Sequence, residues 1–196
     1  MFEVRIHGRG GQGVVTTAEL LSVAAFTEGR QAQAFPTFGS ERTGAPVVGF
    51  CRIDDRPIRT HEPVAEPDAV IIQDAGLIHQ TEVFAGLRAD GYLLINTSWS
   101  LVELGLDAYV QRFRPERVMT IPATELALTH LGRPLPGAVL LGAFAALTGQ
   151  VQLESVTTVV EDRFSGSVAS GNVAAVRAAY GLARSQLEEA SGVHTD

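Results

Sequence analysis

The stretch RIHGRGGQGVVTTAELL, residues 5–21, decides the fold class. A β-favouring run at residues 2–7 leads into it and ends where the glycines begin. From Val14 onward apolar residues recur at helical spacing, and the pattern stops at Gly29, a residue type common at helix C-termini. Strand, glycine turn and helix predict the first half of a βαβ unit, with a second strand at residues 31–35.

Further strands are expected along the first two thirds of the chain. Continuous apolar runs at residues 69–74 and 91–96 are typical of buried parallel strands, and residues 118–121 favour one more. Residues 47–53 are β-rich, and the turn sequence DDRP after them predicts an antiparallel hairpin with residues 58–60.

Helices are expected mainly towards the C-terminus. We predict a short one at residues 79–88 and longer ones at 123–131, 138–147, 153–164 and 170–187. The fold class is therefore α/β, a Rossmann-like, mostly parallel sheet flanked by helices, with a helical C-terminal region. We expect one domain over residues 1–187 and a flexible tail over 188–196.

Composition narrows the classes of function. The net charge is −7, and all 15 basic residues are scattered arginines, which argues against nucleic acid as a partner. The single cysteine, Cys51, can form neither an internal disulfide nor an iron–sulfur or zinc site. No secretory signal and no membrane-spanning run is evident, so we expect a cytoplasmic protein.

The glycine loop, residues 8–13, has the G-x-G-x-x-G spacing of a phosphate-binding turn. A dinucleotide site also needs a carboxylate near the end of the second strand, where this chain has Gln33, Ala34 and Phe35. A P-loop needs a lysine, and the sequence contains none. Glycines that merely pack the first helix on the first strand are the plainer interpretation, but Arg9 and Gln12 suit contact with an anionic or polar group.

The second unusual stretch is the loop PTFGSERTG, residues 36–44, which is rich in turn formers and charge. Loops that follow successive strands of a doubly wound sheet emerge at one edge, so this loop should lie beside the glycine loop. A surface loop with a local salt bridge is the alternative.

Other polar residues offer weaker candidates. The five histidines show no metal-ligand spacing and are interpreted as ordinary, partly exposed residues. Asp74 and Asn96, which end apolar runs, are interpreted as helix caps, and Cys51 as a small buried hydrophobe. We therefore assign no catalytic residue and no metal ligand to this chain.

Several blocks in order resemble one family. They are HGRGGQG at 7–13, AQAFPTFGSERTGAPV at 32–47, RIDDRPIR at 52–59, PDAVIIQD at 67–74 and LGAFAALTG at 141–149. Together they resemble the gamma subunit of the 2-oxoacid:ferredoxin oxidoreductases, the pyruvate synthase type. The resemblance runs from the N-terminus to about residue 187.

The resemblance implies a multi-subunit enzyme that oxidatively decarboxylates a 2-oxoacid to an acyl-CoA. Thiamine diphosphate with Mg would lie in alpha and beta subunits, and [4Fe-4S] clusters in beta and delta subunits or their fused equivalents. Electrons would pass to ferredoxin or another acceptor. The gamma chain would be a non-catalytic module for assembly and for closing the cleft that admits coenzyme A.

Two sets of residues are carried over from the matching blocks as contacts to coenzyme A or to a neighbouring subunit. They are Gly8, Arg9, Gly10, Gly11, Gln12 and Gly13 in the first block, and Glu41, Arg42, Thr43 and Gly44 in the second. The alternative function is a stand-alone Rossmann-like oxidoreductase that binds NAD(P) or FAD. A binding module without an enzymatic partner has no positive sign in the sequence.

Overall fold

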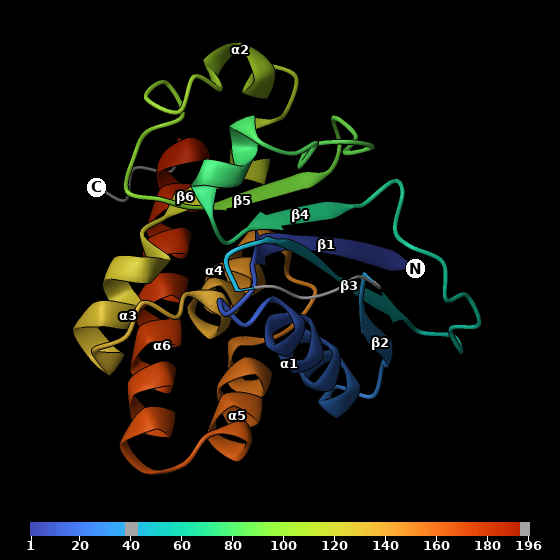
Figure 1. Cartoon of the computed structure of the whole chain (residues 1–196), viewed down its shortest axis with the longest axis vertical. Coiled ribbons are helices and arrows are strands. Elements are labelled where there is room, and N and C mark those ends of the chain that lie inside the picture. The colour runs from blue at the N-terminus through green and yellow to red at the C-terminus, as the bar shows by residue number, and fades with distance from the viewer. Residues whose placement is uncertain (38–42, 193–196) are drawn as a thin grey trace.

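The computed structural model describes residues 1–37 and 43–192 (Figure 1). Its first strand, helix and second strand form where the glycine-containing stretch predicts them, as β1 (Phe2–Arg9), α1 (Val14–Thr27) and β2 (Gln31–Pro36). Gly29 has a φ of 83° just beyond α1, a backbone conformation that favours glycine. Local signals in the sequence therefore define both ends of this helix.

The described residues form a six-stranded sheet in the order β2-β3-β1-β4-β5-β6. The remaining strands are β3 (Pro46–Asp54), β4 (Ala69–Ile72), β5 (Tyr92–Asn96) and β6 (Val118–Ile121). β1, β4, β5 and β6 pair in parallel, whereas β3 runs antiparallel to both β1 and β2. The expected mostly parallel α/β sheet is confirmed, but β3 separates β2 from β1.

The hairpin predicted between residues 47–53 and 58–60 is wrong. β3 is an interior strand, with Ile53 opposite Phe2 of β1 and also opposite Ala32 of β2. Because β1 and β2 occupy both of its edges, β3 has no edge left for residues 58–60. The segment instead places the carbonyl oxygens of Thr60 and Glu62 where the Arg52 guanidinium donates to them.

The helix predicted at residues 79–88 is also wrong. A 3-10 helix, η1 (Ala75–His79), lies just before it, and a series of turns follows. Gly86 has a φ of 73° and packs against the backbone of Ala65, which is incompatible with a continuous α-helix. The Arg5 guanidinium binds the carbonyl oxygens of Val83 and Ala85, which further fixes the turns.

The helical C-terminal region is confirmed. Its members are α3 (Ala123–Leu131), α4 (Gly137–Thr148), α5 (Leu153–Arg163) and α6 (Gly166–Ala190). α6 begins four residues before the predicted start, Ser170, and ends three residues after Leu187.

No helix in residues 1–37 and 43–192 is long and apolar enough to cross a membrane. The division into a domain and a tail stays a prediction.

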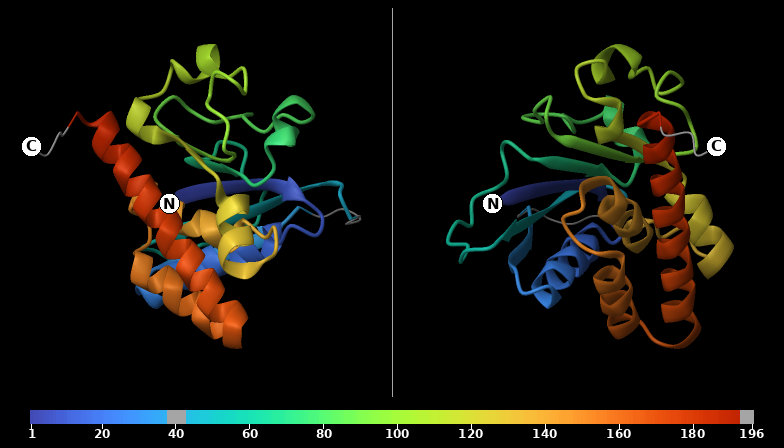
Figure 2. Two further views of the ribbon diagram at one scale, coloured as in Figure 1. Left: turned by 90° about the vertical axis from the view of Figure 1, so that its left-hand side faces the viewer. Right: turned by 180° about the vertical axis from the view of Figure 1, so that it is seen from behind.

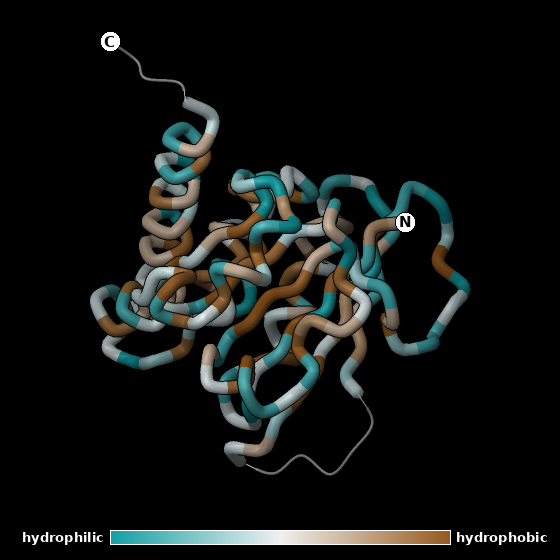
Figure 3. Tube along the Cα trace, turned by 90° about the horizontal axis from the view of Figure 1, so that it is seen from above, coloured by the Kyte–Doolittle hydropathy of each residue, from teal (hydrophilic) through white to brown (hydrophobic). Residues whose placement is uncertain are grey.

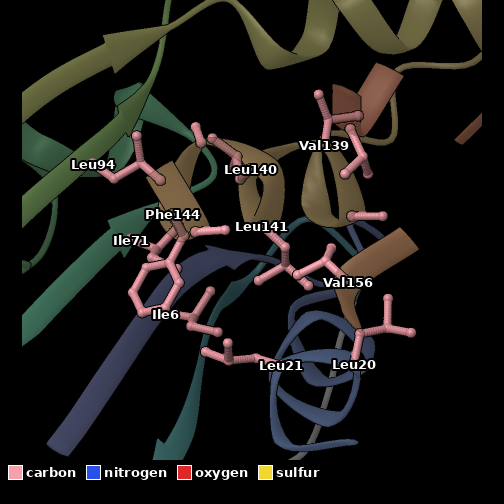
Figure 4. Packing of buried hydrophobic residues seen from close by; sticks show 14 of the residues in the cluster. Ile6, Leu20, Leu21, Ile71, Leu94, Val139, Leu140, Leu141, Phe144 and Val156 are labelled. Atoms are coloured by element: carbon pink, nitrogen blue, oxygen red, sulfur yellow. The ribbon is translucent and has the colours of Figure 1, made fainter. Parts of the chain in front are cut away.

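The two faces of the sheet are covered differently (Figures 1 and 2). On one face, α1, α4, α5 and α6 enclose the larger core; Ile6, Ile71 and Leu94 from the strands meet Leu141 and Phe144 of α4 (Figure 4). The other face is covered by short segments that include η1 and α2 (Asp107–Val110). Hydrophobic residues concentrate in the central strands (Figure 3). Because β1, β4, β5 and β6 run in parallel, the connections that follow them lie along one side of the sheet, which we call the rim.

Candidate functional site

The glycine loop needs glycine for its backbone shape. Gly11 and Gly13 have φ values of 93° and 73°, which other residues adopt only with strain. A Cβ on Gly8 would lie 2.6 Å from the Val14 side chain. Gly13 is the N-cap of α1 and has no side chain with which to cap it. The first hydrogen bond of α1 runs from the Thr17 amide to the Gly13 carbonyl at 2.8 Å. The amides of residues 14–16 therefore have no acceptor within the helix and can bind an outside one.

The glycine loop and the end of the 36–44 loop lie side by side. The Gly10 amide donates to the carbonyl of Ala45 at 2.9 Å, and the Gly44 amide donates to the carbonyl of Gly10 at 3.0 Å. Thr43 forms a bridge with Gly10. The predicted proximity of the two loops is confirmed for these residues. Glu41 and Arg42 lie outside the described residues.

Asp74 connects this rim to the end of β4. Its Oδ2 accepts from Arg9 Nε at 2.9 Å and from Gln12 Nε2 at 3.0 Å, while its Oδ1 accepts from the Gly76 amide at 2.9 Å. The cap role expected for Asp74 is confirmed, at η1. Sequence reasoning missed its bonds to the glycine loop, because no local pattern pairs residues 65 positions apart.

The side chains of Arg9 and Gln12 are bound within the chain. Arg9 also donates to the Gly44 carbonyl at 3.2 Å and to Gln80 Oε1 at 3.0 Å. Gln12 Oε1 accepts from the Arg9 backbone amide at 2.8 Å. Both side chains therefore tie the two loops to one another, and the contact with an outside group that the sequence predicts for them stays a prediction.

A second set of polar contacts lies beneath the loop. Buried Gln73 donates from Nε2 to Thr17 Oγ1 at 2.7 Å, and Thr17 Oγ1 donates to the Gly13 carbonyl at 2.9 Å. Asn96 donates to the Gln73 carbonyl at 2.8 Å and accepts from the Thr124 amide in the first turn of α3 at 3.0 Å. The expected role of Asn96 as a helix cap is wrong, because the N-cap of α3 is Pro122; Asn96 instead links the end of β5 to the first turn of α3.

Two cavities flank the glycine loop. One, of about 430 Å³, includes Arg9, Gly10, Pro36 and Val47 in its lining. The other, of about 310 Å³, is more apolar; its lining includes Leu131, Leu135, Phe164 and Val168, with Arg133 as a charged residue. Gly11, Gly13 and Thr16 line both, so the start of α1 forms the wall between them.

His7 lies directly before the glycine loop and is buried, so the interpretation of this residue as partly exposed is wrong. Its Nε2 accepts a hydrogen bond from Arg5 Nε at 3.0 Å. Burial, and secondarily the Arg5 charge, lower the pKa of His7 from 6.5 to about 4. The imidazole is therefore neutral near pH 7 and acts as a structural acceptor. His61, His79 and His130 are exposed, and His194 lies outside the described residues.

The single cysteine and the possible metal ligands remain to be considered. Cys51 is fully buried on β3, as expected, and burial raises the pKa of its thiol. In residues 1–37 and 43–192, no group of three His, Cys, Asp or Glu side chains could hold a metal ion.

The topology departs from that of a dinucleotide-binding domain. In that fold the second strand lies next to the first and presents an acidic residue to the ribose. Here β3 occupies that position, and the end of β2 carries Ala34, Phe35 and Pro36. The glycine loop thus has neither the neighbouring strand nor the carboxylate that an NAD site uses.

Comparison with known proteins identifies relatives of this chain. A family model described as pyruvate ferredoxin/flavodoxin oxidoreductase matches residues 3–182. The gamma subunit common to the pyruvate and ketoisovalerate oxidoreductases of Pyrococcus abyssi is 46% identical over 180 residues, which are 92% of this chain and 96% of that protein. The crystal structure of pyruvate oxidoreductase subunit PORC from Thermotoga maritima superposes with a TM-score of 0.77 at 34% identity, over 92% of this chain and 95% of that one.

A more distant likeness concerns the fold alone. The 2-oxoglutarate:ferredoxin oxidoreductase from Magnetococcus marinus, solved with 2-oxoglutarate, coenzyme A and succinyl-CoA bound, has a TM-score of 0.69 at 17% identity. The likeness covers 96% of this chain and 31% of that one, so this fold is one part of a longer polypeptide there.

The chain belongs to the pyruvate ferredoxin/flavodoxin oxidoreductase family. Within it, the similarity over nearly the whole length of both chains makes it a gamma-type subunit of a 2-oxoacid:ferredoxin oxidoreductase complex. The expectation of a subunit of a larger oxidoreductase is confirmed.

Proposed function

We propose that the glycine loop and residues 41–44 help to enclose the cleft through which coenzyme A reaches the reacting centre of the complex. The complex would oxidatively decarboxylate a 2-oxoacid to an acyl-CoA and pass electrons to ferredoxin or another acceptor. This chain would serve assembly and closure of the cleft and would carry no catalytic residue. The observation that carries the proposal is the start of α1, which has no side-chain cap and separates two cavities.

The chemistry of the rim suits coenzyme A. Free amides at a helix N-terminus attract phosphate, and the glycines allow close approach of the backbone. The neighbouring 310 Å³ cavity offers apolar side chains to an uncharged arm of the same ligand. Both cavity volumes fall within the range of about 300–1,000 Å³ that small-molecule sites occupy. The Magnetococcus marinus enzyme, which shares the fold, binds coenzyme A.

Thiamine diphosphate with its Mg, and the [4Fe-4S] clusters, would lie in alpha, beta and delta-type subunits. The donors of this chain do not fit a cluster, which needs about four thiolates, because the sequence has one cysteine and that residue is buried. Three other polar side chains near the loop are already hydrogen-bonded within the chain: Asp74 binds Arg9, His7 binds Arg5, and Thr17 binds Gln73.

The test is kinetic and uses the reconstituted complex. Arg9→Ala and Arg42→Ala should each raise the apparent KM for coenzyme A about tenfold, equivalent to about 1.4 kcal/mol of lost binding, or weaken assembly of the complex. Arg88→Ala is the matched control, since Arg88 forms an exposed ion pair shortly before β5, at the amino ends of the parallel strands. Unchanged kinetics together with an unchanged mass of the complex in both variants would contradict the proposal.

A direct measurement complements the kinetics. Coenzyme A should slow hydrogen exchange of the amides at residues 13–16 in the assembled complex, because those amides would gain acceptors. The amides of residues 88–91 serve as the internal reference. Equal exchange with and without coenzyme A at residues 13–16 would count against direct contact.

A further inference from the structure

The shape of the glycine loop is held by a residue outside it. We propose that Asp74 is the positioning residue that fixes the loop for its ligand. Arg9, in this proposal, connects the loops to one another and makes no contact with the phosphates of coenzyme A. The ligand in this inference rests on the proposed function. The hold of Asp74 on the loop rests on contacts alone.

The Asp74 carboxylate joins two segments that are distant in the sequence. Its two oxygens accept three hydrogen bonds, from Arg9 Nε, from Gln12 Nε2 and from the Gly76 amide, all between 2.9 and 3.0 Å. Two of the three donors belong to the glycine loop. Bonds to an ionised acceptor are roughly twice as strong as those between neutral groups, which makes Asp74 the main anchor.

The contacts close a ring around the loop. The Gln12 side chain accepts from the Arg9 amide at 2.8 Å and donates to Asp74, while the Gln12 amide donates to the Arg9 carbonyl at 3.0 Å. The Arg9 side chain returns to the same carboxylate oxygen. Gly10 and Gly11 lie between these two residues in the sequence and line the 430 Å³ cavity, so the ring of contacts restricts their positions.

Each of the three nitrogens of the Arg9 guanidinium makes a hydrogen bond within the chain. Nε binds Asp74, one terminal nitrogen binds the Gly44 carbonyl at 3.2 Å, and the other binds Gln80 Oε1 at 3.0 Å. A phosphate that sought this cation would compete with a carboxylate already paired to it. Arg9 therefore links the glycine loop, Gly44 and η1, and the amides of residues 13–16 remain as the donors for an anion.

A second anchor starts from the adjacent residue. Gln73 reaches to the opposite side of the loop, where it binds Thr17, and Thr17 binds the Gly13 carbonyl. Residues 73 and 74 therefore hold the two ends of the glycine loop from two sides. The end of β4 sets the direction in which the first amides of α1 point.

The experiment replaces Asp74 by asparagine in the assembled complex. An amide keeps the size of the side chain but has one acceptor oxygen and no charge, so it cannot serve both the Arg9–Gln12 pair and Gly76. Without coenzyme A, exchange of the hydrogen-bonded amides of Arg9, Gly10, Gln12 and Gly44 should become at least about fivefold faster. The apparent KM for coenzyme A should rise about tenfold, while kcat and the KM for the 2-oxoacid stay within about twofold.

Three further variants sharpen the test. Asp90→Asn removes the same charge from the exposed pair with Arg88, at 3.0 Å, and should change neither readout. Asp74→Glu keeps the charge and should recover part of the KM for coenzyme A. The double variant Asp74→Asn with Arg9→Gln should raise the KM for coenzyme A by less than the product of the two single effects, because the bond between Arg9 and Asp74 is common to both variants.

The outcomes separate the two ideas. Unchanged exchange in Asp74→Asn overturns the positioning role, as does a raised KM for coenzyme A in Arg9→Ala that Asp74→Asn does not share. Faster exchange with an unchanged KM in both variants supports the hold of Asp74 on the loop and contradicts the proposed function. If Asp74→Asn does not assemble, Gln12→Met, which keeps the charged pair, should raise the KM about threefold; no rise would overturn the proposal.

Discussion

Lowering the pH from about 7.5 to about 5 should destabilise the folded chain by about 2 kcal/mol through His7 alone. Burial, and then the Arg5 charge, lower the pKa of His7 to about 4 in the folded state, whereas an unfolded chain restores the ordinary value of 6.5. The unfolded state therefore binds the proton more readily. The stabilisation is complete above about pH 6.5 and is lost as the pH falls towards 4.

The magnitude follows from the separation of the two pKa values. Each pH unit between them removes about 1.4 kcal/mol, and a fall from 6.5 to about 5 spans roughly 1.5 units. The structural cause is specific: a proton on His7 Nε2 would face the Arg5 N–H that this nitrogen now accepts, at 3.0 Å. The Arg5 side chain is itself 7% exposed, so water cannot relieve the repulsion.

The assay is urea unfolding of the purified chain at a series of pH values, alongside His7→Gln. Glutamine can accept the bond from Arg5 but does not titrate, so the difference between the two stability curves isolates the imidazole. That difference should shift by about 2 kcal/mol in favour of His7→Gln between about pH 7.5 and pH 5. Parallel curves, or an NMR titration of His7 with a pKa near 6.5, would refute the reasoning.

Two further predictions concern the core. Gly142→Ala should lower the free energy of unfolding by at least about 2 kcal/mol, since its Cβ would overlap the Val176 carbonyl where α4 packs on α6; Gly181→Ala, with open space around it, should stabilise α6 by up to about 1 kcal/mol. Urea unfolding of both variants checks this, and equal effects would disprove the packing argument. Cys51 should resist alkylation by iodoacetamide in the native chain and react after denaturation, because burial raises the pKa of its thiol; mass spectrometry detects the adduct, and native labelling would contradict the burial.

Most helices and strands could be predicted because the residues that define them are close together in the sequence. The apolar periodicity of α1 and the glycines at its two ends are read within about twenty residues, and the buried strands are continuous apolar runs. The same reasoning failed for residues 58–60 and 79–88. There the deciding contacts are the pairing of β3 with β1 and β2, and the bonds from Arg5 to distant carbonyls, neither of which leaves a periodic trace.

The sequence by itself determined the α/β class, the strand–glycine–helix unit, the shared rim of the two loops and the family resemblance. These depend on residue type and spacing over short distances and on the common direction of parallel strands. Only the tertiary structure decided that β3 separates β2 from β1, that His7 is buried against Arg5, and that Arg9 pairs with Asp74. Partners 65 residues apart in the sequence meet only when β4 lies beside β1, so the hold on the glycine loop is a property of the folded sheet.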